Sequence, residues 1–139
     1  MQKNVQKNVQ KKAINTSAAP AAVGPYVQGV RTGNLIFVSG QIPLDPKTGV
    51  LVTGGVEEQT RRVMSNLAAI LEAGGSGIDR VVKATVYLTD LGSFEEMNRA
   101  YGSFFPGDKP ARVCVEVSRL PRNALVEIDA IGTVDAADD

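Results

Sequence analysis

Two stretches near the C-terminal end of the chain alternate apolar and polar positions, which is the pattern of half-buried strands. Their apolar positions are Val113, Val115 and Val117 in the first stretch and Val126, Ile128 and Ala130 in the second. We predict that residues 118–124 form a turn that joins the two strands into a hairpin. An antiparallel register would place Cys114 opposite Glu127. It would also place Arg112 opposite Asp129, on the same face of the sheet.

Helical spacing of apolar residues predicts two helices. The first covers residues 56–73, and a pair of glycines directly after it favours an end there. The second opens at Ser93, because Ser93 and Glu96 have the spacing of a capping box. Its apolar stripe consists of Phe94, Met97, Tyr101 and Phe104.

Shorter apolar runs predict further strands at about residues 26–30, 35–38 and 78–89. Residues 31–34 read as a turn, and residues 43–55 as a loop or short hairpin rich in turn-forming residues. The order of elements is then strand, strand, helix, strand, helix, strand, strand. This order predicts an α+β fold, a mixed sheet with two helices packed on one face.

Two helices leave the second face of such a sheet uncovered, although that face still carries valines and leucines. We therefore predict a homo-oligomer in which the uncovered faces pack together. Residues 1–15 begin with a polar repeat, QKNVQKNVQKK, and we expect a disordered tail or an artefact of expression or start-site choice. Residues 16–135 are expected to form a single domain.

Composition narrows the range of functions. The chain has 15 basic and 15 acidic residues, and this balance argues against nucleic acid as a partner. It has no histidine, which excludes a Ser-His-Asp or Cys-His catalytic pair, and its one cysteine supports neither a disulfide nor a Cys/His zinc site. No apolar segment is long enough for a membrane span or a secretory signal, so we expect a cytoplasmic protein without a membrane partner.

The groups that remain for catalysis are Arg, Glu, Tyr, the backbone and water. The predicted hairpin would hold the guanidinium of Arg112 near a carboxylate and the only cysteine. Such a pair is most often a half-exposed ion pair worth under about 1 kcal/mol, and a lone cysteine is most often a small buried hydrophobe. The alternation alone therefore leaves both interpretations open.

Six segments resemble the Rid (YjgF-type) family of reactive-intermediate deaminases. They are GPYVQGV (24–30), VSGQIPLDPKTG (38–49), KATVYLTDL (83–91), MNRAY (97–101), PARVCVEVSRLP (110–121) and VEIDAIG (126–132). The most specific of them is the Pro-Ala-Arg-x-Cys-Val-Glu-Val run followed by Glu127. The resemblance implies a chorismate-mutase-like fold assembled as a homotrimer, with active-site clefts between neighbouring subunits.

The implied activity is hydrolysis of 2-enamine and 2-imine acids, such as 2-aminoacrylate/2-iminopropanoate and 2-iminobutanoate, to 2-keto acids and ammonia. The resemblance implies no cofactor and no metal. Arg112 would bind the substrate carboxylate with a two-pronged, charge-assisted contact. Glu127 would position the attacking water and move its proton.

The further substrate-binding residues that the resemblance implies are Tyr26, Ser39, Gly40, Asn98 and Cys114. The Tyr26 ring would close the pocket from the adjacent chain, and Ser39 and Gly40 would line it with small groups. Cys114 would contribute its backbone N–H, so its thiol need not be a nucleophile.

Alternatives remain for the residues and for the function. Tyr26 also suits an ordinary interface position, Asn98 a solvated helix surface, and Glu116 a simple ion pair with Arg112. The runner-up functions are a small-carboxylate-binding regulatory or chaperone-like module and an endoribonuclease or translation inhibitor. Strong RNA binding is disfavoured by the balanced charge and the few aromatic residues. A pure carboxylate binder would gain nothing from the acid at Glu127.

Overall fold

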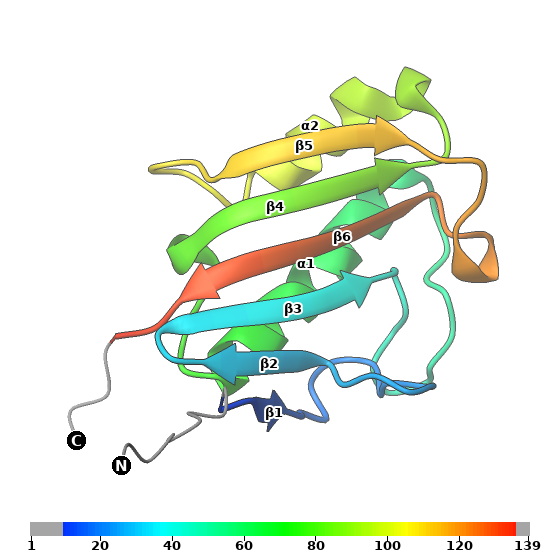
Figure 1. Cartoon of the computed structure of the whole chain (residues 1–139). Coiled ribbons are helices and arrows are strands. Elements are labelled where there is room, and N and C mark those ends of the chain that lie inside the picture. Colours follow the sequence, from blue (N-terminus) through cyan, green and yellow to red (C-terminus); the bar gives the residue numbers. More distant parts are fainter. Residues whose placement is uncertain (1–9, 136–139) are drawn as a thin grey trace, which may run out of the picture.

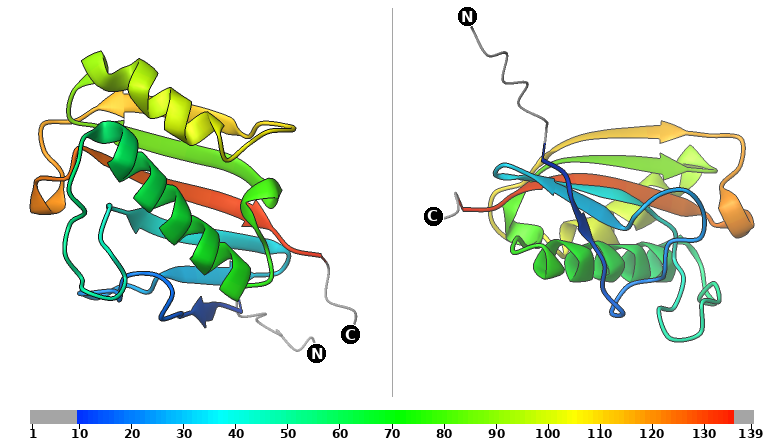
Figure 2. Two further views of the ribbon diagram at one scale, coloured as in Figure 1. Left: turned by 180° about the vertical axis from the view of Figure 1, so that it is seen from behind. Right: turned by 60° about the horizontal axis from the view of Figure 1, so that its bottom comes forward.

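The structure is a computed structural model that describes residues 10–135. Within these residues, one mixed sheet is covered on one face by two helices (Figures 1 and 2). The strands are β1 (Lys12–Ile14), β2 (Gly29–Thr32), β3 (Leu35–Gln41), β4 (Val81–Leu88), β5 (Ala111–Glu116) and β6 (Val126–Thr133). The helices are α1 (Val56–Ala73) and α2 (Phe94–Gly102). The predicted α+β class, with both helices on one face, is confirmed.

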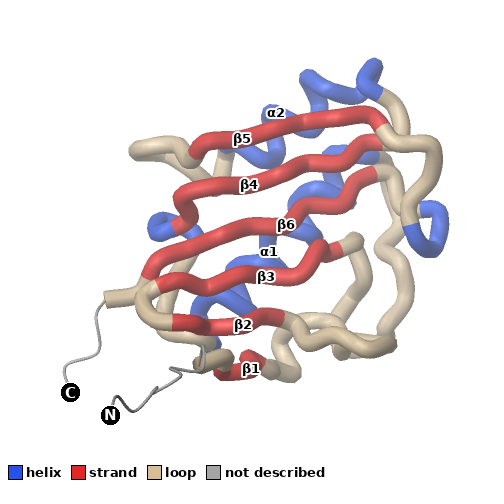
Figure 3. Tube along the Cα trace, in the orientation of Figure 1, coloured by secondary structure: helices blue, strands red, loops and turns tan. Residues whose placement is uncertain are grey.

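The strand order across the sheet is β1-β2-β3-β6-β4-β5 (Figure 3). All neighbours are antiparallel except β4 and β5, which run parallel and are connected through α2. A parallel pair requires such a crossover, because its strands must start at the same edge of the sheet.

The predicted hairpin between β5 and β6 is wrong, because β4 lies between them. Arg112 pairs with Ala84 of β4 instead of with Asp129, and Cys114 pairs with Val86 instead of with Glu127. Alternation identifies strands and their faces, whereas the choice of neighbour depends on packing that a single pattern does not contain. β4 pairs with β6 along one side and with β5 along the other.

The core lies between the sheet and the helices. α1 packs its apolar stripe against β3 and β6, and the most deeply buried side chains include Val63, Leu67, Ile70, Ile36, Val86 and Ile128. At the start of α1 the Gly55 N–H donates to Glu58 Oε1 at 3.1 Å. The helix ends at Gly74-Gly75, and Gly75 has a φ of 91°, a left-handed conformation that favours glycine.

Some predicted boundaries differ from the structure. Lys12–Ile14 lies within the expected tail but forms β1, paired with β2, while residues 1–9 are outside the described part of the chain. The strand expected at 26–30 begins only at Gly29, and the one expected at 78–89 opens with a 3₁₀ turn at Ile78–Arg80. Ser93 precedes α2 as predicted, but its side chain makes no capping hydrogen bond.

The face of the sheet away from the helices carries exposed apolar side chains. Phe37 is 42% exposed, Val113 45% and Val115 38%. A face of this kind is typical of an interface between protein surfaces. The homo-oligomer nevertheless stays a prediction.

Between residues 10 and 135, no helix has both the length and the apolar character that are needed to cross a membrane.

Candidate functional site

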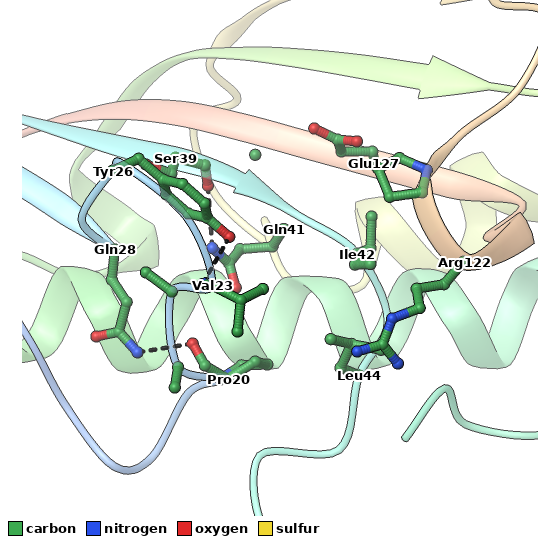
Figure 4. Close-up of a pocket in the computed structure, with 14 residues that line it drawn as sticks. Pro20, Val23, Tyr26, Gln28, Ser39, Gln41, Ile42, Leu44, Arg122 and Glu127 are labelled. Carbon is green, nitrogen blue, oxygen red and sulfur yellow. Dashed lines mark hydrogen bonds between the residues drawn. The ribbon is translucent and has the colours of Figure 1, made fainter. Parts of the chain in front are cut away.

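A cavity of about 530 Å³ opens near the end of β3, and we call it the Glu127 cavity. Its lining includes Tyr26, Ser39, Gly40, Arg122 and Glu127, together with the loop segment 20–23 (Figure 4). Four of the residues that the sequence assigned to the site therefore share one cavity: Tyr26, Ser39, Gly40 and Glu127.

A bulge in the sheet creates room for this cavity. The pairing of β3 with β6 shifts register between Val38 and Gln41, so Ser39 and Gly40 lie where the ladder is interrupted. Bulges of this kind re-aim side chains and are common beside active sites. The Ser39 hydroxyl is fixed here, since it donates to the Val27 carbonyl at 2.6 Å.

Gly40 is required by the position of Glu127. A Cβ at residue 40 would collide with the Glu127 carboxylate. The carboxylate therefore lies against bare backbone, and any larger residue at this position would have to displace it. Glycine is required here because the Glu127 carboxylate lies so close to the backbone of residue 40. A left-handed conformation is not the reason, since Gly40 does not have a positive φ.

The opposite wall of the Glu127 cavity is a loop held by a buried glutamine. Gln28 Nε2 donates to the carbonyls of Thr16 at 3.0 Å and Pro20 at 2.8 Å, and its Oε1 accepts from the Thr16 N–H at 2.7 Å. The Tyr26 hydroxyl accepts from the Val23 N–H at 3.4 Å, which holds the ring at the rim (Figure 4). These hydrogen bonds hold the loop in place, so it forms a fixed wall of the cavity.

The environment of Glu127 favours its protonated form. Burial, and secondly the charge of Asp129, raise the pKa of Glu127 above its ordinary value. Asp129 is itself held by Tyr87, whose hydroxyl donates to Asp129 Oδ2 at 3.1 Å. A carboxylate with a raised pKa in a cavity is suited to accept a proton and to return it.

Arg112 lies elsewhere, on the helix-covered face of β5. Its Nη1 donates to Asn98 Oδ1 at 2.7 Å, and its guanidinium carbon lies 5.5 Å from the centre of the Phe94 ring and 4.9 Å from that of Tyr101. We call this arrangement of Arg112 against α2 the Arg112 cage. Ion pairs in the described part of the chain do not include Arg112.

Strand register separates the two groups of residues within a protomer. Arg112 aligns with the buried Ala84, whereas Glu127 aligns with Tyr87, and Ala84 and Tyr87 point to opposite faces of β4. The prediction that Arg112 and Glu127 share a face is therefore wrong. One protomer has the acid in a cavity and the cation on the other side of the sheet.

Cys114 and Glu116 also have positions that limit their roles. The Cys114 side chain packs against the core, and burial raises the pKa of its thiol while the nearby Arg112 charge opposes the shift. A raised pKa keeps the sulfur protonated and unreactive. Glu116 does not pair with Arg112, because its Oε1 accepts from the Leu91 N–H at 2.9 Å.

Within residues 10–135 no cluster of three or more His, Cys, Asp or Glu has the arrangement of a metal site.

Sequence reasoning missed several contributors to both regions. The walls formed by residues 20–23 and Arg122 carry no motif that distinguishes them from an ordinary loop. The sequence did contain a signal for the aromatic partners of Arg112, because Phe94 and Tyr101 belong to one predicted apolar stripe of a helix. Asn98 lies four residues after Phe94 on the same side of that helix, and a polar residue at this position indicates a polar partner nearby.

This fold, with a carboxylate in a cavity at a bulge and an arginine on the edge strand, defines a small protein of the α+β class. The family model described as Endoribonuclease L-PSP matches residues 16–134. The chain belongs to this family, which is the Rid (YjgF-type) family.

Individual relatives agree with this membership. The chain is 54% identical to a RutC family protein of Pyrococcus abyssi over 121 residues, 87% of this chain and 95% of the relative. It is 46% identical to the 2-iminobutanoate/2-iminopropanoate deaminase of Mus musculus over 121 residues, 87% of this chain and 90% of the relative. The solved structure of E. coli TdcF with bound serine superposes with a TM-score of 0.85 and 44% identity, covering 88% of this chain and 98% of that one.

Proposed function

We propose that the protein hydrolyses 2-enamine and 2-imine acids, such as 2-aminoacrylate/2-iminopropanoate and 2-iminobutanoate, to 2-keto acids and ammonia. The observation that carries the proposal is Glu127, a half-buried carboxylate with a raised pKa held over Gly40 in a cavity. The 46% identity to a murine deaminase of these two imino acids supports the substrate class.

Arg112 binds the substrate carboxylate in this proposal. A guanidinium offers two parallel N–H donors that match the two oxygens of a carboxylate, which a lysine ammonium cannot do. The similarity to TdcF, a protein solved with serine bound, supports a site for a small amino-acid-like carboxylate. The backbone N–H of Cys114, next but one along β5, is proposed to orient the same ligand.

Glu127 acts on water in this proposal. The imine reacts with its nitrogen protonated: a water held within about 3 Å of Glu127 attacks carbon 2 through its oxygen and gives one proton to the Glu127 carboxylate. The resulting carbinolamine carries a hydroxyl and an amino group on carbon 2. Glu127 returns the proton to the nitrogen, the C–N bond breaks and ammonia leaves. The hydroxyl then gives its proton back to the Glu127 carboxylate as the C=O bond of the 2-keto acid forms, and ammonia or solvent carries this proton away. An enamine enters the same route after it takes a proton on carbon 3.

Two protomers are needed to bring these groups together. Because Arg112 and Glu127 lie on opposite faces of one sheet, the working site combines the Glu127 cavity of one protomer with the β5 edge of its neighbour. The exposed apolar side chains on the helix-free face supply a surface for this assembly. We propose the homotrimer that the family resemblance implies. In a closed ring of three protomers, the Glu127 cavity of each protomer faces the β5 edge of the next one.

Mixing two inactive variants tests this proposal. Arg112→Lys and Glu127→Gln proteins are denatured, combined in equal amounts and refolded, and residual imine is trapped with semicarbazide while a dehydratase generates it. Each variant alone is expected to be inactive. Random reassembly gives about one site in four with both native residues, so about a quarter of wild-type activity should return. No recovery in mixed trimers of confirmed composition would contradict sites between protomers, and an inactive wild-type protein would contradict the deaminase itself.

The alternative of a carboxylate-binding regulatory module predicts a different result. Such a protein binds 2-keto or amino acids through Arg112 but does not turn over imines, and Glu127→Gln would then strengthen binding by removing a like charge. Unchanged or tighter binding together with a wild-type protein that leaves the imine intact would favour this alternative.

A further inference from the structure

The α2 residues that surround Arg112 form a regular pattern. Phe94, Met97, Asn98 and Tyr101 occupy positions i, i+3, i+4 and i+7 of α2, which is one side of a helix. All four approach the guanidinium: the two rings at 5.5 and 4.9 Å, Asn98 Oδ1 at 2.7 Å and the Met97 sulfur at 3.8 Å from Nη1. A single helix face is thus built around one side chain of the neighbouring strand.

The cage leaves one edge of the guanidinium without a partner. Both polar contacts of the cage go to Nη1, and Nε and Nη2 donate no hydrogen bond to any residue between 10 and 135. Nε and Nη2 form one of the parallel donor pairs that suit a carboxylate. The two aromatic rings lie within the range of cation–π attraction and so hold the charge without consuming a donor.

We infer that Asn98, Phe94 and Tyr101 are positioning residues that lock the Arg112 guanidinium so that its Nε–Nη2 edge receives the substrate carboxylate. This inference rests on the proposed function for the identity of the ligand. It changes the role of Asn98 from a residue that binds substrate to one that acts through Arg112.

Tyr101 provides a matched pair of variants for the aromatic part. Its hydroxyl is buried and has no hydrogen-bond partner in the described structure, and burial raises the pKa of that hydroxyl. Only the ring is used in the cage. Tyr101→Phe keeps the ring and should leave Arg112 locked, whereas Tyr101→Leu removes the quadrupole that attracts the cation.

The test measures Arg112 directly as well as through a ligand. The rate of rotation of the Arg112 guanidinium is followed by ¹⁵N NMR, and binding of 2-oxobutanoate by calorimetry, both on the assembled full-length protein. Asn98→Ala and Tyr101→Leu are expected to speed the rotation and to weaken 2-oxobutanoate binding about tenfold, the equivalent of one lost hydrogen bond. Tyr101→Phe should match the wild type in both measurements.

Asn98→Asp provides the rescue, because it keeps an oxygen acceptor at the same distance from Nη1. It should restore slow rotation while its charge still weakens binding of the anion. Fast rotation in Asn98→Asp, or wild-type rotation and affinity in Asn98→Ala, would overturn the inference, as would a loss in Tyr101→Phe equal to that in Tyr101→Leu. Because the NMR measurement needs no substrate, a locked guanidinium in a protein that turns over no imine would refute only the proposed function.

Discussion

The Glu127 cavity and the Arg112 cage are built from opposite kinds of structure. The Glu127 cavity lies at irregular backbone, a bulge in β3 and a loop held by Gln28, and its acid makes no ion pair among residues 10–135, although Arg122 also lines the cavity. The Arg112 cage lies on a regular strand beside a regular helix, and its charged group is a cation without an acid. The difference fits the proposal that each protomer carries two complementary parts of a site, one to activate water and one to hold an anion.

The strongest test of this division is Glu127→Gln. The amide cannot take a proton from water, so imine turnover should fall by about 10²–10⁴-fold while 2-oxobutanoate still binds. Semicarbazide trapping measures turnover, and calorimetry measures binding. Asp108→Asn, in an exposed loop, is the control and should leave both unchanged. Equal loss of binding and turnover would show that the Glu127 cavity does not have a separate catalytic role.

Arg112→Lys should lose binding as well as turnover. A lysine keeps the charge but loses the two-pronged contact and the Asn98 hydrogen bond, so 2-oxobutanoate should bind about 10- to 100-fold more weakly. Calorimetric titration measures the change, and the exposed Arg119→Lys serves as the control. If Arg112→Lys binds the keto acid as tightly as the wild type, the anion does not bind at the Arg112 cage.

Gly40→Ala tests whether the position of Glu127 depends on the bare backbone of the β3 bulge. The added methyl group must push the Glu127 carboxylate away, so turnover should fall by about 10- to 100-fold with little effect on affinity for 2-oxobutanoate. Gly107→Ala is the matched control, because a Cβ there meets no atom within 4 Å. Steady-state kinetics by the trapping assay would reveal the change. A fully active Gly40→Ala protein would mean that the position of Glu127 over the bulge is irrelevant to catalysis.

The smallest expected effect concerns stability and pH. The raised pKa of Glu127 means that the folded protein holds this proton above the ordinary value of 4.5, where the unfolded chain has lost it. Its contribution to stability is therefore complete at low pH and is lost as pH rises through the folded pKa. Glu127→Gln removes this dependence, so its Tm relative to wild type should rise by ~1–3 °C between about pH 4 and pH 7.5. Scanning calorimetry at the two pH values measures it, and a constant difference would contradict the raised pKa.

The two regions also differ in how far the sequence predicts them. The helix at residues 56–73 and the apolar face of β6 follow from periodicity, because each element buries one continuous stripe. The pairing of β5 was missed, because any strand of the right length and alternation satisfies the same local pattern. Gly40 and Glu127 were identified by resemblance, but their contact depends on a register shift that no local pattern encodes. Asn98 was assigned to substrate, whereas its side-chain oxygen accepts a hydrogen bond from Arg112.

The place of β5 at the end of the sheet has a consequence for the isolated chain. Among residues 10–135 one side of this strand pairs with no other strand, so it presents free backbone donors and acceptors beside Val113 and Val115. Exposed strand edges of this kind template pairing with other chains and promote aggregation. In the homotrimer that we propose, assembly protects this edge from that outcome as well as completing the proposed site, so dilution or damage that releases single protomers should lead to insoluble material.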